Sequence, residues 1–143
     1  MMASAAATRV ALFADTFYEV NGAARTCREW DAFARRHRLP FFCVRWGSDR
    51  ALSAEACELV RSNLAFLVDP DLRFDPFFYR VLGPVQKQLE KFRPDVIHIT
   101  TPPASHFEIA RLCLEHGCHV YVEKPLTIDA GEAKQLVAFR VTS

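Results

Sequence analysis

Short apolar runs alternate along the chain with segments whose apolar residues recur at a helical spacing. The short runs have the branched and aromatic composition of buried strands, and they cover residues 9–14, 41–46, 64–68, 95–100 and 119–122. The periodic segments predict helices from Gly22 to about residue 38, over 52–63, 76–92 and about 104–116, and from Asp129 onward. Because strands and helices alternate, we expect an α/β fold, a Rossmann-like three-layer sandwich with a parallel sheet of about five strands.

The helical segments carry further signals. Gly83 and Pro84 fall inside 76–92 and predict a kink or a break there, because proline cannot continue a helical hydrogen-bond ladder. Asp129 precedes Glu132 at the spacing of a capping box and predicts the start of the last helix. The residues that we expect to be buried are Ala23, Cys27, Trp30 and Ala34 in the helix from Gly22, and Ala133, Leu136 and Val137 in the last helix.

The composition is that of one folded domain. The chain has 143 residues, of which 50% are hydrophobic and 24% charged, enough for one packed core and too little for two. We expect a disordered leader over residues 1–8 and a single domain over 9–143. The net charge of +1 does not indicate nucleic-acid binding, and no apolar run is long enough to span a membrane.

The cysteines and glycines exclude several kinds of site. The five cysteines contain no C-x-x-C and lie in apolar segments, which favours reduced thiols in a cytoplasmic protein. Residues 113–119 hold two cysteines and two histidines, but their spacing matches no usual zinc pattern, so we expect no metal. The five glycines lie too far apart for G-x-G-x-x-G or for a P-loop, so a bound nucleotide would be held without a glycine fingerprint.

Parallel sheets bind ligands outside the carboxyl ends of their strands, and three loops are predicted to lie there. They are residues 15–22, 101–106 and 123–126. In the second loop two prolines fix the backbone, and Ser105 is placed to cap the following helix. In the third loop Lys124 is placed to donate to a substrate oxygen or to transfer a proton, with Glu123 tuning it.

Residues 95–137, DVIHITTPPASHFEIARLCLEHGCHVYVEKPLTIDAGEAKQLV, resemble the nucleotide-binding domain of the Gfo/Idh/MocA oxidoreductases. That family has a T-P-x-x-x-H-like turn after its fourth strand and an E-K-P after the next. The resemblance implies that the Pro-rich turn contacts the ribose and phosphates of NAD or NADP, and that the E-K-P lysine lies beside nicotinamide and substrate. The matching positions are Thr101, Pro102, His106, Glu123, Lys124 and Pro125, of which Lys124 and Glu123 would be catalytic.

Residues 9–101 resemble a second family, the N-terminal domain of the family 4 glycosyltransferases. The matching pieces are RVALFADTFYEVNGAART, REWDAFARR and FRPDVIHIT. This resemblance implies that the backbone near Asn21 and Gly22 approaches the phosphate of a nucleotide-sugar donor. The two resemblances meet in the strand at 95–100, so the chain has the pattern of a chimera.

These patterns predict a nucleotide-binding domain that resembles the NAD(P)-binding domain of the oxidoreductases and is not catalytic alone. The alternatives are the acceptor-side domain of a glycosyltransferase and a non-catalytic interaction module. In each case we expect a small nucleotide or sugar ligand, together with a second domain or a second copy of the chain.

Overall fold

The computed structural model describes residues 7–14, 17, 20, 22–46, 56–59, 66–69, 72–74 and 82–139. Most of the predicted leader therefore lies outside the described residues. The main sheet contains β1 (Val10–Ala14), β2 (Phe41–Trp46), β3 (Ala56–Leu59), β6 (Val96–Thr100) and β7 (His119–Val122). All its strands are parallel, and their order is β3-β2-β1-β6-β7. The predicted parallel sheet of about five strands is confirmed.

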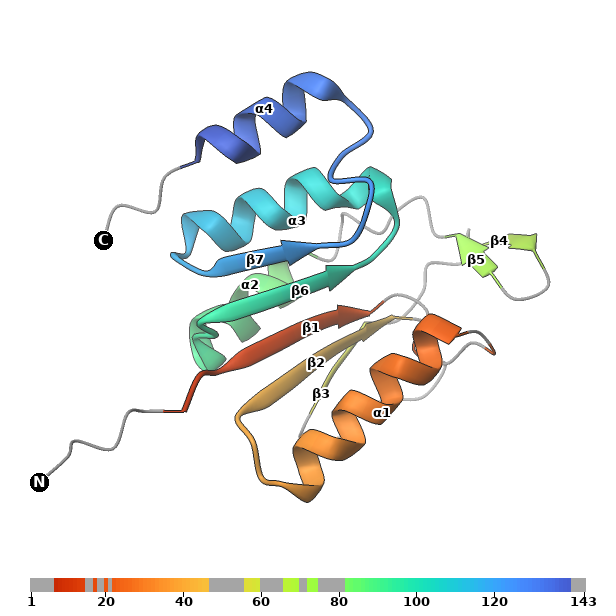
Figure 1. Ribbon diagram of the computed structural model, residues 1–143, viewed down its shortest axis with the longest axis vertical. Coiled ribbons are helices and arrows are strands. Elements are labelled where there is room, and N and C mark those ends of the chain that lie inside the picture. The colour runs from red at the N-terminus through yellow and green to blue at the C-terminus, as the bar shows by residue number, and fades with distance from the viewer. Residues whose placement is uncertain are drawn as a thin grey trace, which may run out of the picture.

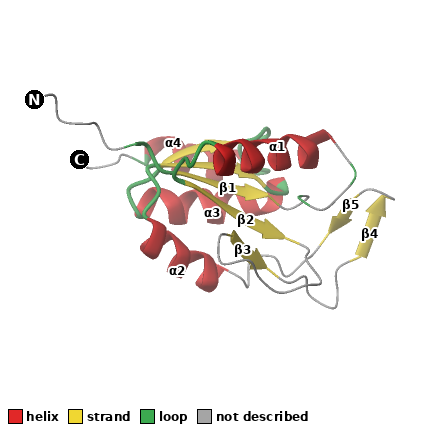
Figure 2. Ribbon diagram, turned by 90° about the horizontal axis from the view of Figure 1, so that it is seen from below, coloured by secondary structure: helices red, strands yellow, loops and turns green. Residues whose placement is uncertain are grey.

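In the described residues, four helices accompany the sheet: α1 (Gly22–Arg36), α2 (Leu82–Phe92), α3 (Pro103–Glu115) and α4 (Ala130–Ala138). Helix α1 lies on the near face of the sheet in Figure 1, and α2 lies behind it. Figure 2 gives the same arrangement from below, with the strands between α1 and α2. Helix α4 packs on α3. The predicted three-layer sandwich is confirmed.

Two apolar clusters hold these layers together, one on each face of the sheet. Alternate residues of a strand point to opposite faces, so β1 and β2 each contribute to both clusters. On the α2 and α3 face, Phe13, Ile97 and Ile99 are fully buried and belong to one cluster with Ile109 and Cys113 of α3. On the α1 face the buried residues are Leu12, Ala14, Phe17, Cys27 and Cys43.

The third strand is not where the sequence pattern placed it. Residues 56–59, inside the segment 52–63 predicted to be helical, form β3 and pair with β2 in parallel. The predicted strand at 64–68 overlaps β4 (Phe66–Asp69), which pairs antiparallel with β5 (Leu72–Phe74) in a separate small sheet. A short apolar segment without clear periodicity is compatible with either a strand or a helix, and here pairing with β2 decides it.

Some details of the helices also differ from prediction. Helix α2 spans Leu82–Phe92, so Pro84 falls in its first described turn, where the missing amide breaks no helical bond. The part of the segment 76–92 that precedes it lies outside the described residues, so the kink or break predicted at Gly83 and Pro84 stays a prediction. Trp30 and Val137 are 44% and 77% exposed, and Ala23 is exposed as well. The buried stripe of α1 consists of Ala24, Cys27 and Ala34. The end of α3 is confirmed, because Gly117 has a φ of 75° just beyond it.

The position of β6 in the core can be tested by truncating Ile97, whose side chain is 0% exposed. We expect Ile97→Ala to lower the free energy of unfolding by about 2–5 kcal/mol, because it leaves a cavity between the sheet and α3. Val137→Ala, at a position that is 77% exposed, serves as the control and should change it by less than about 0.5 kcal/mol. Denaturant unfolding measures both values, and equal values for the two variants would contradict the central placement of β6.

Candidate functional site

The strands β1, β6 and β7 end at the same level, and this places three connections at one edge of the sheet. Ala14, the last residue of β1, pairs with Thr100, the last residue of β6. Thr100 also donates a side-chain hydrogen bond to the carbonyl of Phe13 at 2.9 Å, which ties the two strand ends together. The strand order runs outward in both directions from β1 and β6, so this edge is the switch point at which such sheets bind ligands.

The turn from β6 into α3 is braced by buried polar groups. Thr101 and Ser105 are 5% and 7% exposed, and their side-chain oxygens lie 2.8 Å apart. Ser105 Oγ also lies 2.7 Å from the carbonyl oxygen of Pro102. Pro102 is the N-cap residue of α3 and makes no side-chain cap, so the expected cap by Ser105 is wrong. Ser105 instead binds the turn that precedes the helix.

The connection from β7 to α4 carries the predicted Glu-Lys-Pro sequence on the surface. Glu123 donates its backbone N–H to the carbonyl of Ile99 at 3.0 Å, which continues the pairing with β6. Glu123, Lys124 and Pro125 are all exposed, and the Lys124–Pro125 peptide bond is cis. The connection ends at Asp129, whose carboxylate accepts the N–H groups of Gly131 and Glu132, as expected for a cap.

His106 joins these two connections. Its side chain is 1% exposed. Nε2 lies 2.6 Å from the carbonyl oxygen of Thr101, and Nδ1 lies 2.8 Å from the carbonyl oxygen of Pro125. The ring of His106 therefore joins two of the predicted residues, Thr101 and Pro125, through their backbone carbonyls. Pro102 follows Thr101 in the chain, and Glu123 and Lys124 precede Pro125.

The connection from β1 to α1 is described only in part, and Asn21 lies outside the described residues. Gly22 is the first residue of α1, and a Cβ atom built on it would meet nothing within 4 Å. Phe17 is 5% exposed, and its carbonyl oxygen accepts a hydrogen bond from Nη1 of Arg28 at 2.6 Å. The Arg45 guanidinium lies 4.1 Å from the centre of the Phe17 ring. The large aromatic residue Phe17 thus occupies this connection, where a dinucleotide fingerprint would have glycine.

Asp31 of α1 lies beside the contact between Arg45 and the Phe17 ring. Its carboxylate binds the guanidinium of Arg45 at the end of β2, and the side chains of both residues are largely buried. The contact of Phe17 with Arg45 and the ion pair of Arg45 with Asp31 were not predicted from the sequence. Pairing between residues fourteen positions apart leaves no periodic signal in the chain.

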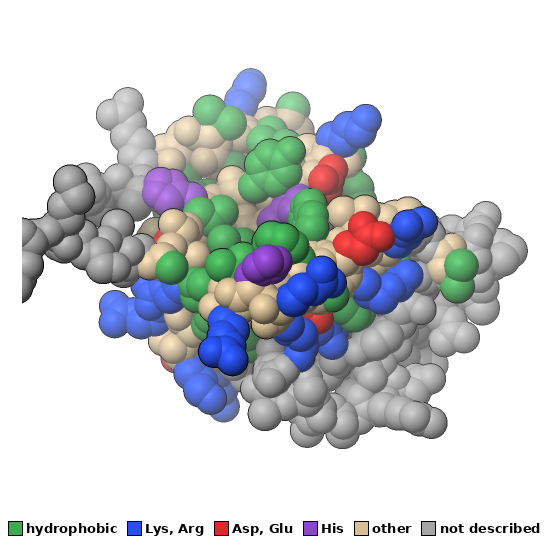
Figure 3. Space-filling view, turned by 60° about the horizontal axis from the view of Figure 1, so that its bottom comes forward, with side chains coloured by type: hydrophobic (Ala, Val, Ile, Leu, Met, Phe, Trp, Pro, Cys, Tyr) green, Lys and Arg blue, Asp and Glu red, His purple; other side chains and the backbone are tan. Residues whose placement is uncertain are grey.

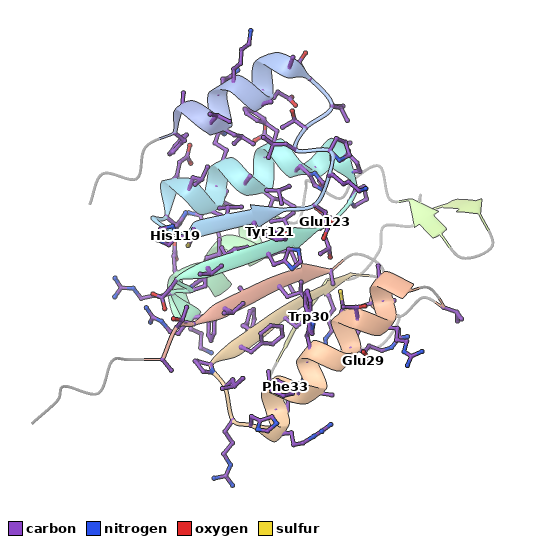
Figure 4. All side chains as sticks on the ribbon, in the orientation of Figure 1. Glu29, Trp30, Phe33, His119, Tyr121 and Glu123 are labelled. Carbon is purple, nitrogen blue, oxygen red and sulfur yellow. The ribbon has the colours of Figure 1, made fainter. Side chains whose placement is uncertain are left out.

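His98 on β6 was also missed, although it lies next to Glu123. Its Nε2 is 3.4 Å from Glu123 Oε1, but that nitrogen has no aligned hydrogen-bond partner among the described residues. The ring centres of Trp30 and Tyr121 lie 5.4 Å and 4.7 Å from its own. Figure 4 labels Trp30, Tyr121 and Glu123 on the near side of the sheet. The space-filling view in Figure 3, with the bottom of the molecule turned forward, shows hydrophobic and histidine side chains together on the surface. Burial lowers the pKa of His98, while Glu123 raises it in part.

The described part of the chain contains no cluster of three or more histidine, cysteine, aspartate or glutamate side chains that could hold a metal ion. In the same part, every helix is too short or too polar to cross a membrane.

Comparison with known proteins assigns the family. The model of the GFO_IDH_MocA family, described as "Oxidoreductase family, NAD-binding Rossmann fold", matches residues 49–141. The chain therefore belongs to this oxidoreductase family. The resemblance predicted from residues 95–137 is confirmed.

Two curated relatives match a short part of the chain. The UDP-N-acetylglucosamine 3-dehydrogenase of Acidithiobacillus ferrooxidans is 40% identical over 43 residues, which is 30% of this chain and 14% of that protein. The D-glucoside 3-dehydrogenase of Escherichia coli is 35% identical over 51 residues, 36% of this chain and 14% of that protein. The chain thus matches only a small part, 14%, of the full length of either relative.

Solved structures share the fold over nearly the whole chain. The D-galactose-1-dehydrogenase protein from Rhizobium etli gives a TM-score of 0.52 at 15% identity and covers 97% of this chain and 35% of its own. The WlbA (WbpB) dehydrogenase from Thermus thermophilus, in complex with NAD and UDP-GlcNAcA, gives 0.50 at 19% identity and covers 92% of this chain and 38% of its own. At these identities the likeness concerns the fold alone.

The expected glycosyltransferase part and the chimera are not supported. The family match begins at residue 49, well inside the segment 9–101 that resembles glycosyltransferases, and it runs through the supposed junction at 95–100. Solved oxidoreductases cover 92–97% of the chain. The glycosyltransferase pieces are strand and helix patterns that many α/β proteins share, which explains the misleading resemblance.

The lowered pKa of His98 predicts how stability depends on pH. Between its folded pKa and its ordinary value of 6.5, the unfolded chain binds more protons than the folded chain, so the free energy of unfolding falls as pH decreases through that window. His98→Phe keeps a ring between Trp30 and Tyr121 but cannot titrate, and we expect a smaller loss of stability between about pH 7 and about pH 5. Urea unfolding at both pH values measures this.

The exposed His116 provides the matched control for that experiment. His116→Gln should keep the wild-type loss of stability on acidification. If His98→Phe and wild type lose the same stability, His98 does not cause the acid sensitivity.

Proposed function

We propose that this chain binds NAD or NADP at the carboxyl edge of its sheet and serves as the nucleotide-binding domain of an oxidoreductase. The observation that carries the proposal is the junction at His106, which sets the Thr101 turn and the Glu123–Pro125 connection side by side at the switch in strand order. The membership of a family described as NAD-binding supports the choice of ligand.

The residues present fit the phosphates of such a cofactor. Helix α1 begins at Gly22 and has no acidic residue in its first turn, so its N–H groups and positive dipole end favour an anion. The empty space around Gly22 leaves room for a phosphate to approach the backbone. Asn21 and Gly22 would hold the phosphates in this proposal, by backbone contacts and without a glycine fingerprint.

The other two connections would hold the nicotinamide end. Thr101, Pro102 and Pro125 would contact the cofactor. The buried His106 would hold the backbone of Thr101 and of Pro125 in place beneath it. A bound nicotinamide supplies a hydride acceptor or donor. Lys124 is exposed beside this site and would donate a hydrogen bond to a substrate oxygen or take its proton, while Glu123 next to it would adjust the local charge.

The substrate class that we propose is a sugar. Named relatives are dehydrogenases of UDP-N-acetylglucosamine, of D-glucosides and of D-galactose. Because the chain spans about a third of the solved relatives, we propose that hydride transfer needs residues that this chain does not supply, from a second domain or a second copy.

We also propose a cytoplasmic location. Cys27, Cys43, Cys113 and Cys118 are buried, and none of these four forms a disulfide bond. Burial raises the pKa of Cys43 to about 12, so this thiol stays protonated and unreactive. Reduced, buried thiols suit a reducing compartment.

Gly22 offers a direct test of phosphate binding. We expect Gly22→Asp to weaken NADH binding at least about tenfold, because a carboxylate at the start of α1 repels the pyrophosphate even at surface dielectric. The same substitution should leave the melting temperature unchanged or slightly raised, since acids stabilise helix N-termini. Gly22→Asn, which has the same shape without charge, is the matched control. Nicotinamide fluorescence titration measures the affinity for NADH and for NADPH, and the rise in melting temperature reports binding of UDP-N-acetylglucosamine.

Two results would contradict the proposal. The first is that wild type binds neither NADH nor NADPH in this titration. The second is that Gly22→Asp and Gly22→Asn bind NADH equally. Binding of UDP-N-acetylglucosamine in the absence of nicotinamide binding would revive the nucleotide-sugar alternative.

A further inference from the structure

A small cavity lies between the end of α1 and the start of β2, in the lower part of Figure 1. Phe41 is the first residue of β2 and pairs with Val10, the first residue of β1, so the cavity lies at the amino edge of the sheet, away from the proposed cofactor site. We propose that this cavity binds a small organic anion, a carboxylate attached to an apolar group, through the guanidinium of Arg38. This proposal does not depend on the function proposed above.

The size and lining of the cavity define the kind of molecule that fits it. Its volume is about 280 Å³, at the lower end of the range found for ligand pockets, so the ligand is small. The residues that line it are Asp31, Ala34, Arg35, Arg38, Leu39 and Phe41. Three of these side chains are apolar and three are charged, so a fitting ligand combines an apolar group with a charge.

The charge that remains on the lining is positive. The carboxylate of Asp31 already binds the guanidinium of Arg45 and accepts a hydrogen bond from Nε of Arg35 at 3.0 Å, so a cationic ligand would have to compete with both arginines. The side chain of Arg38 forms no hydrogen bond or ion pair with any described residue. A guanidinium binds a carboxylate through two parallel hydrogen bonds, so Arg38 supplies the anion-binding group of the cavity.

Arg38 stands at a backbone position that favours glycine. Helix α1 ends in a Schellman motif, in which the N–H of Leu39 donates to the carbonyl of Ala34 at 2.9 Å and the N–H of Arg38 donates to that of Arg35 at 3.2 Å. The turn gives Arg38 a φ of 52°, in the left-handed region that is unfavourable for a residue with a Cβ atom. Because glycine would make the same turn without this cost, the arginine side chain points to a role beyond the turn itself.

The end of α1 also favours a carboxylate over a phosphate. The carboxyl end of a helix carries a partial negative charge, which opposes a doubly charged anion more than a singly charged one. Leu39 is 48% exposed and Phe41 is half-buried, so both can cover the apolar group of a ligand and remove it from water. Inorganic phosphate gains nothing from these two side chains.

Sodium benzoate is the probe for this site, titrated into the full chain and followed by ¹H–¹⁵N NMR. We expect saturable shifts of the backbone amide signals of Leu39 and Phe41. Benzamide has nearly the same shape without the charge, and inorganic phosphate has the charge without the apolar group, so each should bind at least about tenfold more weakly. The absence of saturable shifts with benzoate would overturn the site. Binding of benzamide or of phosphate as tight as that of benzoate would overturn the assigned ligand class.

A pair of glycine variants then tests the role of Arg38. We expect Arg38→Gly to weaken benzoate binding about tenfold, because a charged hydrogen-bonding partner is lost, while glycine keeps the left-handed turn. Arg93→Gly is the matched control, because Arg93 follows α2 with a φ of 50° and does not line the cavity. It should change the melting temperature as little as Arg38→Gly does and should keep wild-type affinity for benzoate.

Two results of this comparison would overturn the proposal. One is an affinity for benzoate that is the same in Arg38→Gly and in wild type, and the other is an equal loss of affinity in both glycine variants. If Arg38→Gly does not fold, Arg38→Asn takes its place, because asparagine also tolerates the left-handed conformation and carries no charge. The same loss of affinity is expected for that variant, and wild-type affinity in it would overturn the role of Arg38.

Discussion

The parallel pairing of β1 with β6 is the constraint on which the candidate site depends. Val10 to Ala14 pair residue by residue with Val96 to Thr100, and Arg9 anchors the start of this register by donating its backbone N–H to the Asp95 carboxylate at 2.7 Å. Because a shift by one residue would turn the buried Ile97 and Ile99 to the opposite face, the apolar core fixes the register. The strand ends are thereby level, and the connections that leave them must lie side by side.

At the carboxyl edge of the sheet, buried polar side chains hold the backbone that carries the exposed polar side chains. Thr101, Ser105 and His106 are almost fully buried, and each binds a backbone carbonyl or a neighbouring hydroxyl. Buried polar groups are costly unless paired, so this set favours one arrangement of the turn over others. The side chains of Lys124 and Glu123 are exposed, while the backbone of their connection is held by His106 at Pro125 and by Ile99 at Glu123.

The sequence predicted the parts of this arrangement that leave a local pattern. Strands β1, β2, β6 and β7 and helices α1 and α3 were predicted because apolar runs and helical spacing are local, and the cap at Asp129 was predicted for the same reason. Strand β3 was missed because its identity comes from pairing with β2. The sequence also placed His106 among the ligand residues, but its two carbonyl partners, 5 and 19 positions away, follow only from the folded chain.

In the proposed function, the chain would have to hold a pyrophosphate without the glycine residues that usually do so in this fold. A glycine fingerprint allows a backbone to approach a pyrophosphate closely, whereas here Phe17 is buried in the first connection and Arg45 above it is bound to Asp31. Since that guanidinium is already paired, it adds little positive potential at the edge. The remaining attraction for a phosphate comes from the backbone N–H groups at the start of α1, where Gly22 leaves open space. In the proposed function, cofactor affinity would therefore depend more on the connections after β6 and β7 than it does in a domain with the glycine fingerprint.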